Sequence, residues 1–142
     1  MFLGEYEYKI DPKGRVAIPP KLRSQFSEGI VLAKGFDHCV NAYPPPAWKQ
    51  FSESFNTLPP GRSKSRRIDR FLFASSFSLE LDEQGRVLLP PPLRQYAAIK
   101  ESLVIAGVKD HLEIWSKELW NEEQARMEEE AWQIAEGMET RQ

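Results

Sequence analysis

Residues 11–23 read Asp11-Pro12-Lys13-Gly14-Arg15-Val16-Ala17-Ile18-Pro19-Pro20-Lys21-Leu22-Arg23, and the pattern returns as Asp82-Glu83-Gln84-Gly85-Arg86-Val87-Leu88-Leu89-Pro90-Pro91-Pro92-Leu93-Arg94. The second copy follows the first by 71 positions without a gap. The aspartate, glycine, first arginine, valine, two prolines, leucine and last arginine all recur. A repeat of this length indicates two related halves, and an internal repeat dictates the architecture of the whole chain.

The similarity continues on both sides of this stretch. Ile30-Val31-Leu32-Ala33 reappears as Leu103-Val104-Ile105-Ala106, and Asp37-His38 as Asp110-His111. We therefore predict a first repeat over residues 1–57, a basic connector helix over 58–75, a second repeat over 76–125, and an acidic helix end and tail over 126–142. Each repeat has only about 55 residues, which would bury a marginal core alone, so the two are expected to share one core.

Within each repeat, the pattern predicts a strand, a turn and a returning strand. Residues 5–10 alternate apolar and charged side chains, which is typical of a half-buried strand. Asp11 to Gly14 has the chemistry of a tight turn. Residues 15–18 are then expected to return as the second strand of a hairpin, until the prolines end it. A short helix follows over 21–26. The second repeat predicts the same elements over 76–81, 86–89 and 92–97.

The rest of the chain supplies more short strands and three helices. Strands are expected over 30–33, 39–43, 103–106 and 112–115. A helix through about Phe55 carries Trp48, Phe51 and Phe55 on one face, and a basic helix covers 62–74. Ser116 is placed as the N-cap of an acidic helix that Gly137 ends. These elements predict an α+β, mainly β fold: a small β-barrel built from two interlocking copies, with short helices and a C-terminal helix.

The charge of the chain is unevenly distributed. The net charge is −2, but residues 1–100 carry 15 Lys and Arg against 10 Asp and Glu, whereas residues 101–142 carry 4 against 11. A basic body with an acidic tail is compatible with nucleic-acid binding. The single cysteine, Cys39, excludes an intramolecular disulfide and a cysteine-based zinc site. No signal peptide and no apolar run of about 20 residues is present, so we expect a cytoplasmic protein without a membrane partner.

The pattern Asp-x-x-Gly-Arg-Val-x-x-Pro-x-x-Leu-Arg resembles the AbrB-type DNA-binding domains. With two copies, the opening Met-Phe-Leu-Gly-Glu-Tyr and the stretch at residues 110–120, the chain resembles the MraZ family over about residues 1–130. The resemblance implies a swapped-hairpin or double-psi barrel and a bacterial, nucleoid-associated transcriptional regulator. It also implies ring-shaped homo-oligomers, with an octamer as one candidate. The implied target is double-stranded DNA, at direct repeats in the promoter of its own gene, which heads the division and cell-wall cluster.

The candidate DNA-binding residues are Arg15, Lys13, Arg86, Lys21 and Arg23, and the candidate turn-bracing residues are Asp11, Gly14, Asp82 and Gly85. Arginine pairs with guanine or with phosphate, and lysines contact phosphates that position a protein without reading sequence. For each arginine the alternative is an ion pair with the aspartate four positions earlier. For Lys13, Lys21 and Arg23 the alternative is an ordinary solvated position on the surface. Because Lys13 and Lys21 become Gln84 and Pro92, the first copy is expected to dominate.

The sequence also bears on other functions. The run Arg62, Lys64, Arg66 and Arg67 fits an electrostatic footprint. A solvated helix face or an oligomer contact explains it at least as well. His38 and His111 lack further ligands at useful spacing, so neither a metal nor another cofactor is expected. An aspartic-protease dyad requires Asp-Thr/Ser-Gly, which neither copy has, so we do not expect an enzyme. An oligomeric protein-binding scaffold that uses the acidic helix stays open as the alternative.

Overall fold

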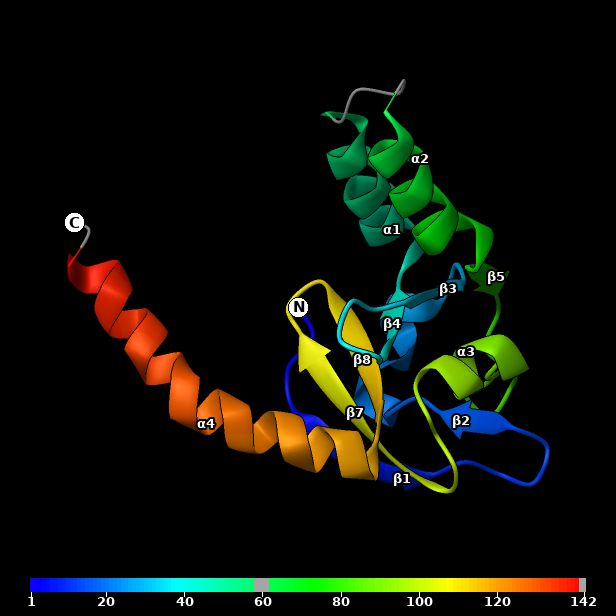
Figure 1. The fold of residues 1–142 in the computed structure, drawn as a ribbon. Coiled ribbons are helices and arrows are strands. Elements are labelled where there is room, and N and C mark those ends of the chain that lie inside the picture. Colours follow the sequence, from blue (N-terminus) through cyan, green and yellow to red (C-terminus); the bar gives the residue numbers. More distant parts are fainter. Residues whose placement is uncertain (58–61, 141–142) are drawn as a thin grey trace.

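The computed structural model describes residues 1–57 and 62–140. Its strands form a six-stranded antiparallel sheet in the order β1-β7-β8-β4-β3-β5 and a two-stranded sheet of β2 and β6 (Figure 1). The strand bounds are β1 Glu5–Lys9, β2 Arg15–Ala17, β3 Ile30–Lys34, β4 Val40–Tyr43, β5 Phe77–Leu79, β6 Arg86–Leu88, β7 Ser102–Val108 and β8 His111–Ser116. The α+β class with antiparallel sheets is confirmed, but the described strands do not close into a barrel.

The pairing expected across each turn is wrong. β1 does not pair with β2 but with β7 of the other repeat, with Glu5 opposite Ala106. β5 likewise pairs with β3 rather than with β6. The two repeats are interleaved because each strand that leads into a turn takes its ladder partner from the other repeat. This exchange confirms the shared core, since one buried cluster contains Val16 and Ile18 together with Leu89 and Ile105.

A local twofold axis relates the two copies of the repeated stretch. Val16 lies opposite Val87 at the centre of the β2–β6 ladder, and both side chains are buried. On either side of this pair, Arg15 lies opposite Leu88 and Ala17 opposite Arg86. Beyond them, Ile18 N–H donates to the Gly85 carbonyl at 2.9 Å and Leu89 N–H to the Gly14 carbonyl at 2.8 Å. Replacing both residues of one pair by their equivalents in the other repeat, 71 positions away, gives another pair of this set. The axis therefore places the two turns at opposite ends of one short ladder.

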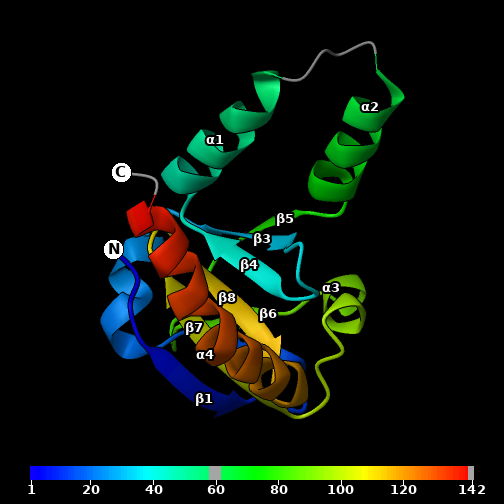
Figure 2. The same cartoon turned by 60° about the vertical axis from the view of Figure 1, so that its left-hand side comes forward.

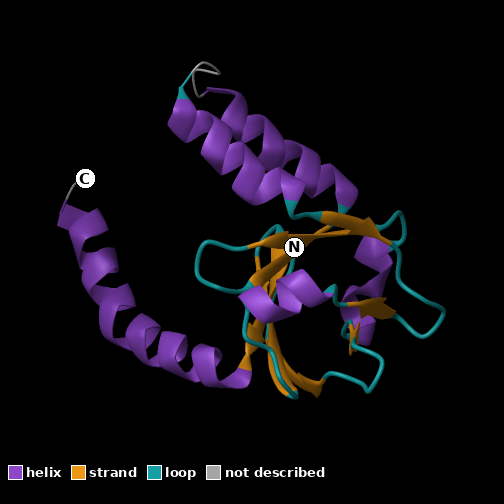
Figure 3. Ribbon diagram, turned by 45° about the vertical axis from the view of Figure 1, so that its right-hand side comes forward, coloured by secondary structure: helices purple, strands orange, loops and turns teal. Residues whose placement is uncertain are grey.

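Two helical segments form an arm that stands away from the sheets (Figures 2 and 3). The helices are α1 Pro45–Glu53, followed by η2 Ser54–Thr57, and α2 Ser63–Asp69, followed by η3 Arg70–Ala74. The predicted aromatic face of the first helix is confirmed, because the Trp48 and Phe51 rings lie 5.6 Å apart and Phe51 and Phe55 lie 5.2 Å apart. The predicted break at 58–61, where the connector begins, lies outside the described residues.

The remaining helices are short, except at the C-terminus. η1 Pro20–Phe26 and α3 Pro91–Tyr96 follow the two turns, and α4 Lys117–Thr140 leaves the sheet as a long curved helix (Figure 1). The Ser116 cap is confirmed, because its hydroxyl accepts the Leu119 N–H at 3.1 Å. The predicted end at Gly137 is wrong. One helical glycine costs only about 1 kcal/mol relative to alanine, which does not stop the helix.

Among the described residues, none of the helices combines the length and the apolar composition that a membrane span requires. The start of α4 is instead fixed to the sheet by a side-chain contact. The indole N–H of Trp120 donates to a carboxylate oxygen of Glu5 at 2.9 Å. From Ala125 to Met138 the side chains of α4 are exposed, and they include Trp132, Ile134 and Met138.

Candidate nucleic-acid interface

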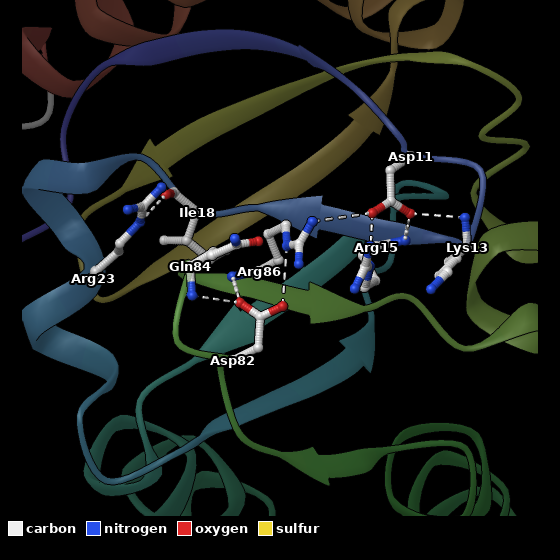
Figure 4. Close-up of polar contacts among 8 residues, drawn as sticks. All are labelled: Asp11, Lys13, Arg15, Ile18, Arg23, Asp82, Gln84 and Arg86. Carbon is white, nitrogen blue, oxygen red and sulfur yellow. Dashed lines mark hydrogen bonds and ion pairs between the residues drawn. The ribbon is translucent and has the colours of Figure 1, made fainter.

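The first turn, residues Asp11 to Arg15, is built around one carboxylate (Figure 4). Asp11 Oδ1 accepts the backbone N–H groups of Lys13 at 2.9 Å and Arg15 at 2.8 Å, and the Asp11 carbonyl accepts Gly14 N–H at 2.9 Å. Asp11 Oδ2 accepts the Arg15 Nε–H at 2.7 Å. The bond from the Arg15 backbone is the main cause that holds the pKa of Asp11 below its usual value. The charged aspartate therefore fixes both the backbone and the arginine.

The second turn, residues Asp82 to Arg86, repeats this hydrogen-bond pattern. Asp82 Oδ1 accepts the backbone N–H groups of Gln84 and Arg86, both at 2.9 Å. Asp82 Oδ2 accepts the Arg86 Nε–H at 3.0 Å. The backbone bond from Arg86 is again the main cause that lowers the pKa of the aspartate. Sequence identity at the aspartate, glycine and arginine thus reproduces the same turn twice.

Both arginines lie near the local axis and share one acid. Arg86 Nη1 lies 3.7 Å from Asp11 Oδ2, in addition to its contact with Asp82 (Figure 4). The side chains of Arg15 and Arg86 are 30% and 29% exposed. The ion pairs considered from the sequence are therefore formed in the structure. They leave each guanidinium partly exposed, and a guanidinium has five N–H donors, so a contact with a nucleic acid stays geometrically open.

The other predicted basic residues are in different places. Lys13 and Lys21 are exposed. Arg23 turns toward the second turn, where its Nε–H donates to the Ile18 carbonyl at 2.8 Å. Gly85 has a φ of +75°, and a Cβ added to it would overlap the Arg23 side chain. Arg23 thus occupies the space above the second turn.

The counterpart of Arg23 in the second repeat, Arg94, does not take the equivalent place. Its Nε–H donates to the Ile99 carbonyl at 3.0 Å and its Nη2–H to the Lys100 carbonyl at 2.6 Å. In the first repeat the strand motif that begins at Ile30 follows Arg23 by seven positions. In the second repeat the motif that begins at Leu103 follows Arg94 by nine positions, so this loop is two residues longer. This longer loop supplies the carbonyls that hold Arg94. The space beside Gly14 is therefore left open, and a Cβ there would meet only Leu88 Cδ1 at 3.7 Å.

A cavity adjoins each turn, and the two cavities differ in charge. The first-turn cavity, of about 600 Å³, contains Lys13, Arg94 and Lys100 in its wall. The second-turn cavity, of about 360 Å³, contains Glu80, Asp82 and Glu83 with Arg23. Sequence reasoning missed Arg94 and Lys100 as neighbours of the first turn. The alignment of Arg94 with Arg23 could have marked Arg94 as a residue near a turn. It could not have given the position of Arg94, because the first repeat lacks the two extra loop residues that redirect its side chain.

The basic run on α2 is not part of this site. Arg62, Lys64 and Arg67 are exposed, and Figure 1 places α2 in the arm, at the opposite side of the sheets from the β2 turn. Any electrostatic footprint at α2 is therefore separate from the two turns.

The two repeated histidines also have different surroundings. His38 is exposed and its ring lies 4.8 Å from that of Tyr96. His111 is only 14% exposed, with Nδ1 2.7 Å from Asp110 and Nε2 3.6 Å from Glu113. Burial lowers the pKa of His111, but the hydrogen bonds to Glu113 and Asp110 outweigh it and the net shift is upward. In the part of the chain that the structure describes, no three His, Cys, Asp or Glu side chains gather to hold a metal.

These features define a class of internally duplicated α+β proteins in which a local twofold axis relates two Asp-x-x-Gly-Arg turns. A family model described as "MraZ protein, putative antitoxin-like" matches the chain twice, over residues 1–71 and over residues 72–142. The chain belongs to the MraZ family and carries two tandem MraZ domains.

Curated relatives agree with this assignment over the length of the chain. The transcriptional regulator MraZ of Dehalococcoides mccartyi is 46% identical over 140 residues, covering 98% of this chain and 99% of that protein. The regulator MraZ of Herpetosiphon aurantiacus is 48% identical over 120 residues, or 84% of each chain. That of Leuconostoc citreum is 37% identical over 138 residues, or 97% of this chain and 96% of that protein. The family is one of transcriptional regulators and not of enzymes.

Proposed function

We propose that this protein is a sequence-specific DNA-binding regulator that contacts double-stranded DNA through the first turn. The carrying observation is that Asp11 fixes the Lys13 and Arg15 backbone, while the Lys13 side chain is exposed and Arg15 is partly exposed. A turn held in this way needs little further ordering on binding, which is a main cost of association. In this proposal Arg15 reads base edges and Lys13 and Lys21 contact phosphates.

The second turn has a lesser role in this proposal. Arg86 shares its positive charge between Asp82 and Asp11, and the cavity wall beside the turn is acidic. Both features disfavour a phosphate at the Arg86 guanidinium. Arg23 bonds to the Ile18 carbonyl through Nε and has further N–H donors for a phosphate. Asp11, Gly14, Asp82 and Gly85 hold the two turns in shape.

The proposed targets are direct repeats in the promoter of the bacterial division and cell-wall cluster, including the protein's own gene. The proposed assembly is a ring-shaped homo-oligomer, with an octamer as one candidate, associated with the nucleoid. Linked subunits that engage successive repeats raise the effective concentration of each contact. The strand exchange between the two repeats supports the swapped-hairpin arrangement of the AbrB type.

One observation favours the scaffold as the second candidate function. The outer part of α4 exposes Trp132, Ile134 and Met138, each more than 60% exposed, among many acidic residues. Large exposed apolar side chains mark interaction surfaces when they are grouped. A scaffold of this kind would use α4 for protein partners and would not select among DNA sequences.

The test is a salt titration of binding to a duplex from immediately upstream of this gene, against a scrambled duplex. Each phosphate contact adds about −0.9 to the slope of log affinity against log salt. We expect Arg15→Ala to lose most of the preference for the promoter duplex while the oligomer, measured by light scattering, is unchanged. Arg126→Ala, the same substitution on exposed α4, is the matched control and should behave as wild type.

Two outcomes would overturn the proposal. If the wild-type protein binds neither duplex at low salt, DNA binding is excluded and the scaffold is favoured. If Arg15→Ala discriminates between the duplexes as well as wild type, the first turn is not the reading element.

A further inference from the structure

The first-turn cavity shares only Lys13 with the proposed DNA contact. Its volume is about 600 Å³, which lies in the range of small-molecule sites. It is bounded by the turn on one side and by α3 with its following loop on the other. That loop contains Ala98 at a φ of +55°, a conformation that costs a residue with a Cβ about 1–2 kcal/mol. The conformation ends α3, where Ala98 N–H donates to the Gln95 carbonyl and Ile99 N–H to the Arg94 carbonyl, both at 3.1 Å.

The cavity is open for a specific structural reason. In the second repeat, the loop carbonyls of Ile99 and Lys100 hold the Arg94 guanidinium. At the equivalent place beside the other turn, Arg23 lies over Gly85. The same arginine of the repeat therefore covers one turn and leaves the other uncovered.

The wall of the cavity combines apolar surface with positive charge. Leu88 offers exposed apolar surface, at 51%, whereas the other lining residues Leu89 and Ile99 are only 2% and 4% exposed. Lys13, Arg94 and Lys100 supply the charge, and none of the described residues that line the cavity is acidic. Apolar walls with a few placed charges select a ligand by size and by the sign of its charge.

We propose that the first-turn cavity binds a small amphipathic anion, an apolar body that carries a carboxylate, sulfonate or phosphate group. The apolar body lies against Leu88, and the anionic group lies among the three basic side chains. Because Lys13 belongs to both sites, the bound anion neutralises a DNA contact and competes with DNA. This second step rests on the proposed function, whereas binding of the anion does not.

The test uses 1-anilinonaphthalene-8-sulfonate, a fluorescent amphipathic anion, titrated into the full-length protein without DNA. The site variant is Leu88→Glu/Lys100→Glu, which removes apolar wall and reverses one charge. The matched control is Leu3→Glu/Lys49→Glu, which makes the same two substitutions at exposed positions outside the cavity. Both variants change the net charge equally, and circular dichroism with thermal melts confirms that each is folded.

We expect saturable binding at one site per chain, at least tenfold weaker in the site variant and within twofold of wild type in the control. Equal binding by the two variants would overturn the proposed site, since the probe would then bind elsewhere, for example on α4. With DNA present, the probe should release the promoter duplex over the concentrations at which it fills the cavity. If the duplex stays bound when the cavity is full, competition is excluded. A protein that binds the probe but no DNA would overturn only the proposed function.

Discussion

The first turn and the second turn have the same backbone hydrogen bonds but lie among side chains of opposite charge. Lys13, Arg94 and Lys100 surround an open space beside the first turn. Glu80 and Glu83 lie beside the second, which Arg23 covers. The comparison shows that the hydrogen bonds of a turn and its surroundings can change independently. Duplication keeps the aspartate, glycine and arginine that make the turn, while neighbouring residues decide what each turn can contact.

The largest effect we expect separates the two turn glycines. Both Gly14 and Gly85 have a positive φ, so alanine at either position costs about 1–2 kcal/mol. Gly85→Ala also displaces Arg23 and its hydrogen bond to Ile18, which adds about 1 kcal/mol. Denaturant unfolding should therefore show a total loss of roughly 2–3 kcal/mol for Gly85→Ala and a smaller loss for Gly14→Ala.

The double variant Arg23→Ala/Gly85→Ala sharpens this comparison. If Arg23 causes the difference, the additional cost of Gly85→Ala should vanish in the Arg23→Ala background. Equal losses at the two glycines in wild type would mean that Arg23 does not constrain the second turn.

The next effect concerns DNA and exchanges the charge at equivalent positions. Lys13→Gln gives the first turn the residue that the second turn has at this position. We expect DNA binding about tenfold weaker at moderate salt, and a slope of log affinity against log salt that is less steep by about 0.9. Gln84→Lys is the reciprocal change and should alter affinity by less than twofold. A gain in affinity for Gln84→Lys as large as the loss for Lys13→Gln would show that both turns face the DNA.

A smaller effect should appear as the pH falls. The pKa of Asp11 and of Asp82 is lowered in the fold, so each carboxylate stabilises the protein above its unfolded pKa, near 3.9. This contribution is lost as the pH falls through the lowered value. Asp11→Asn should lower Tm at pH 7 more than Asp82→Asn, because Asp11 also contacts Arg86.

The Tm differences of Asp11→Asn and Asp82→Asn from wild type should both become smaller toward pH 3. Thermal melts across this range, with Asp37→Asn at an exposed position as the control, measure the effect. A difference that does not change with pH would contradict the role of the charged forms.

The smallest effect separates the two histidines. The pKa of His111 is raised in the fold, so its charged form stabilises the protein below about pH 6.5. That contribution is lost as the pH rises through the raised value. The Tm of the wild type should therefore decrease slightly between pH 6 and pH 8. His111→Gln should abolish this decrease, whereas His38→Gln should show it as the wild type does. Melts that lose the decrease equally in both variants would show that the difference in surroundings has no consequence.

Local structure followed closely from the sequence, because it depends on neighbouring residues. Asp11 and Gly14 predict the turn, and Ser116 caps its helix. Strand partners did not follow, because a turn of this kind is compatible with either an intra-repeat hairpin or an exchanged strand. The register that places Glu5 opposite Ala106 depends on which apolar faces fill one core. The positions of Arg23 and Arg94 depended on loop length rather than on residue type.

The exchange of strands has a consequence for folding during synthesis. β1 is among the first segments to leave the ribosome, but its partner β7 is encoded about a hundred residues later. At roughly 5–20 residues per second, β1 waits on the order of 5–20 s with an unpaired edge and alternating aromatic side chains. Contacts of such long sequence separation also slow folding in general. The interleaving that unites the two repeats therefore exposes the nascent chain to aggregation, and a chain truncated before β7 leaves β1 without its native partner.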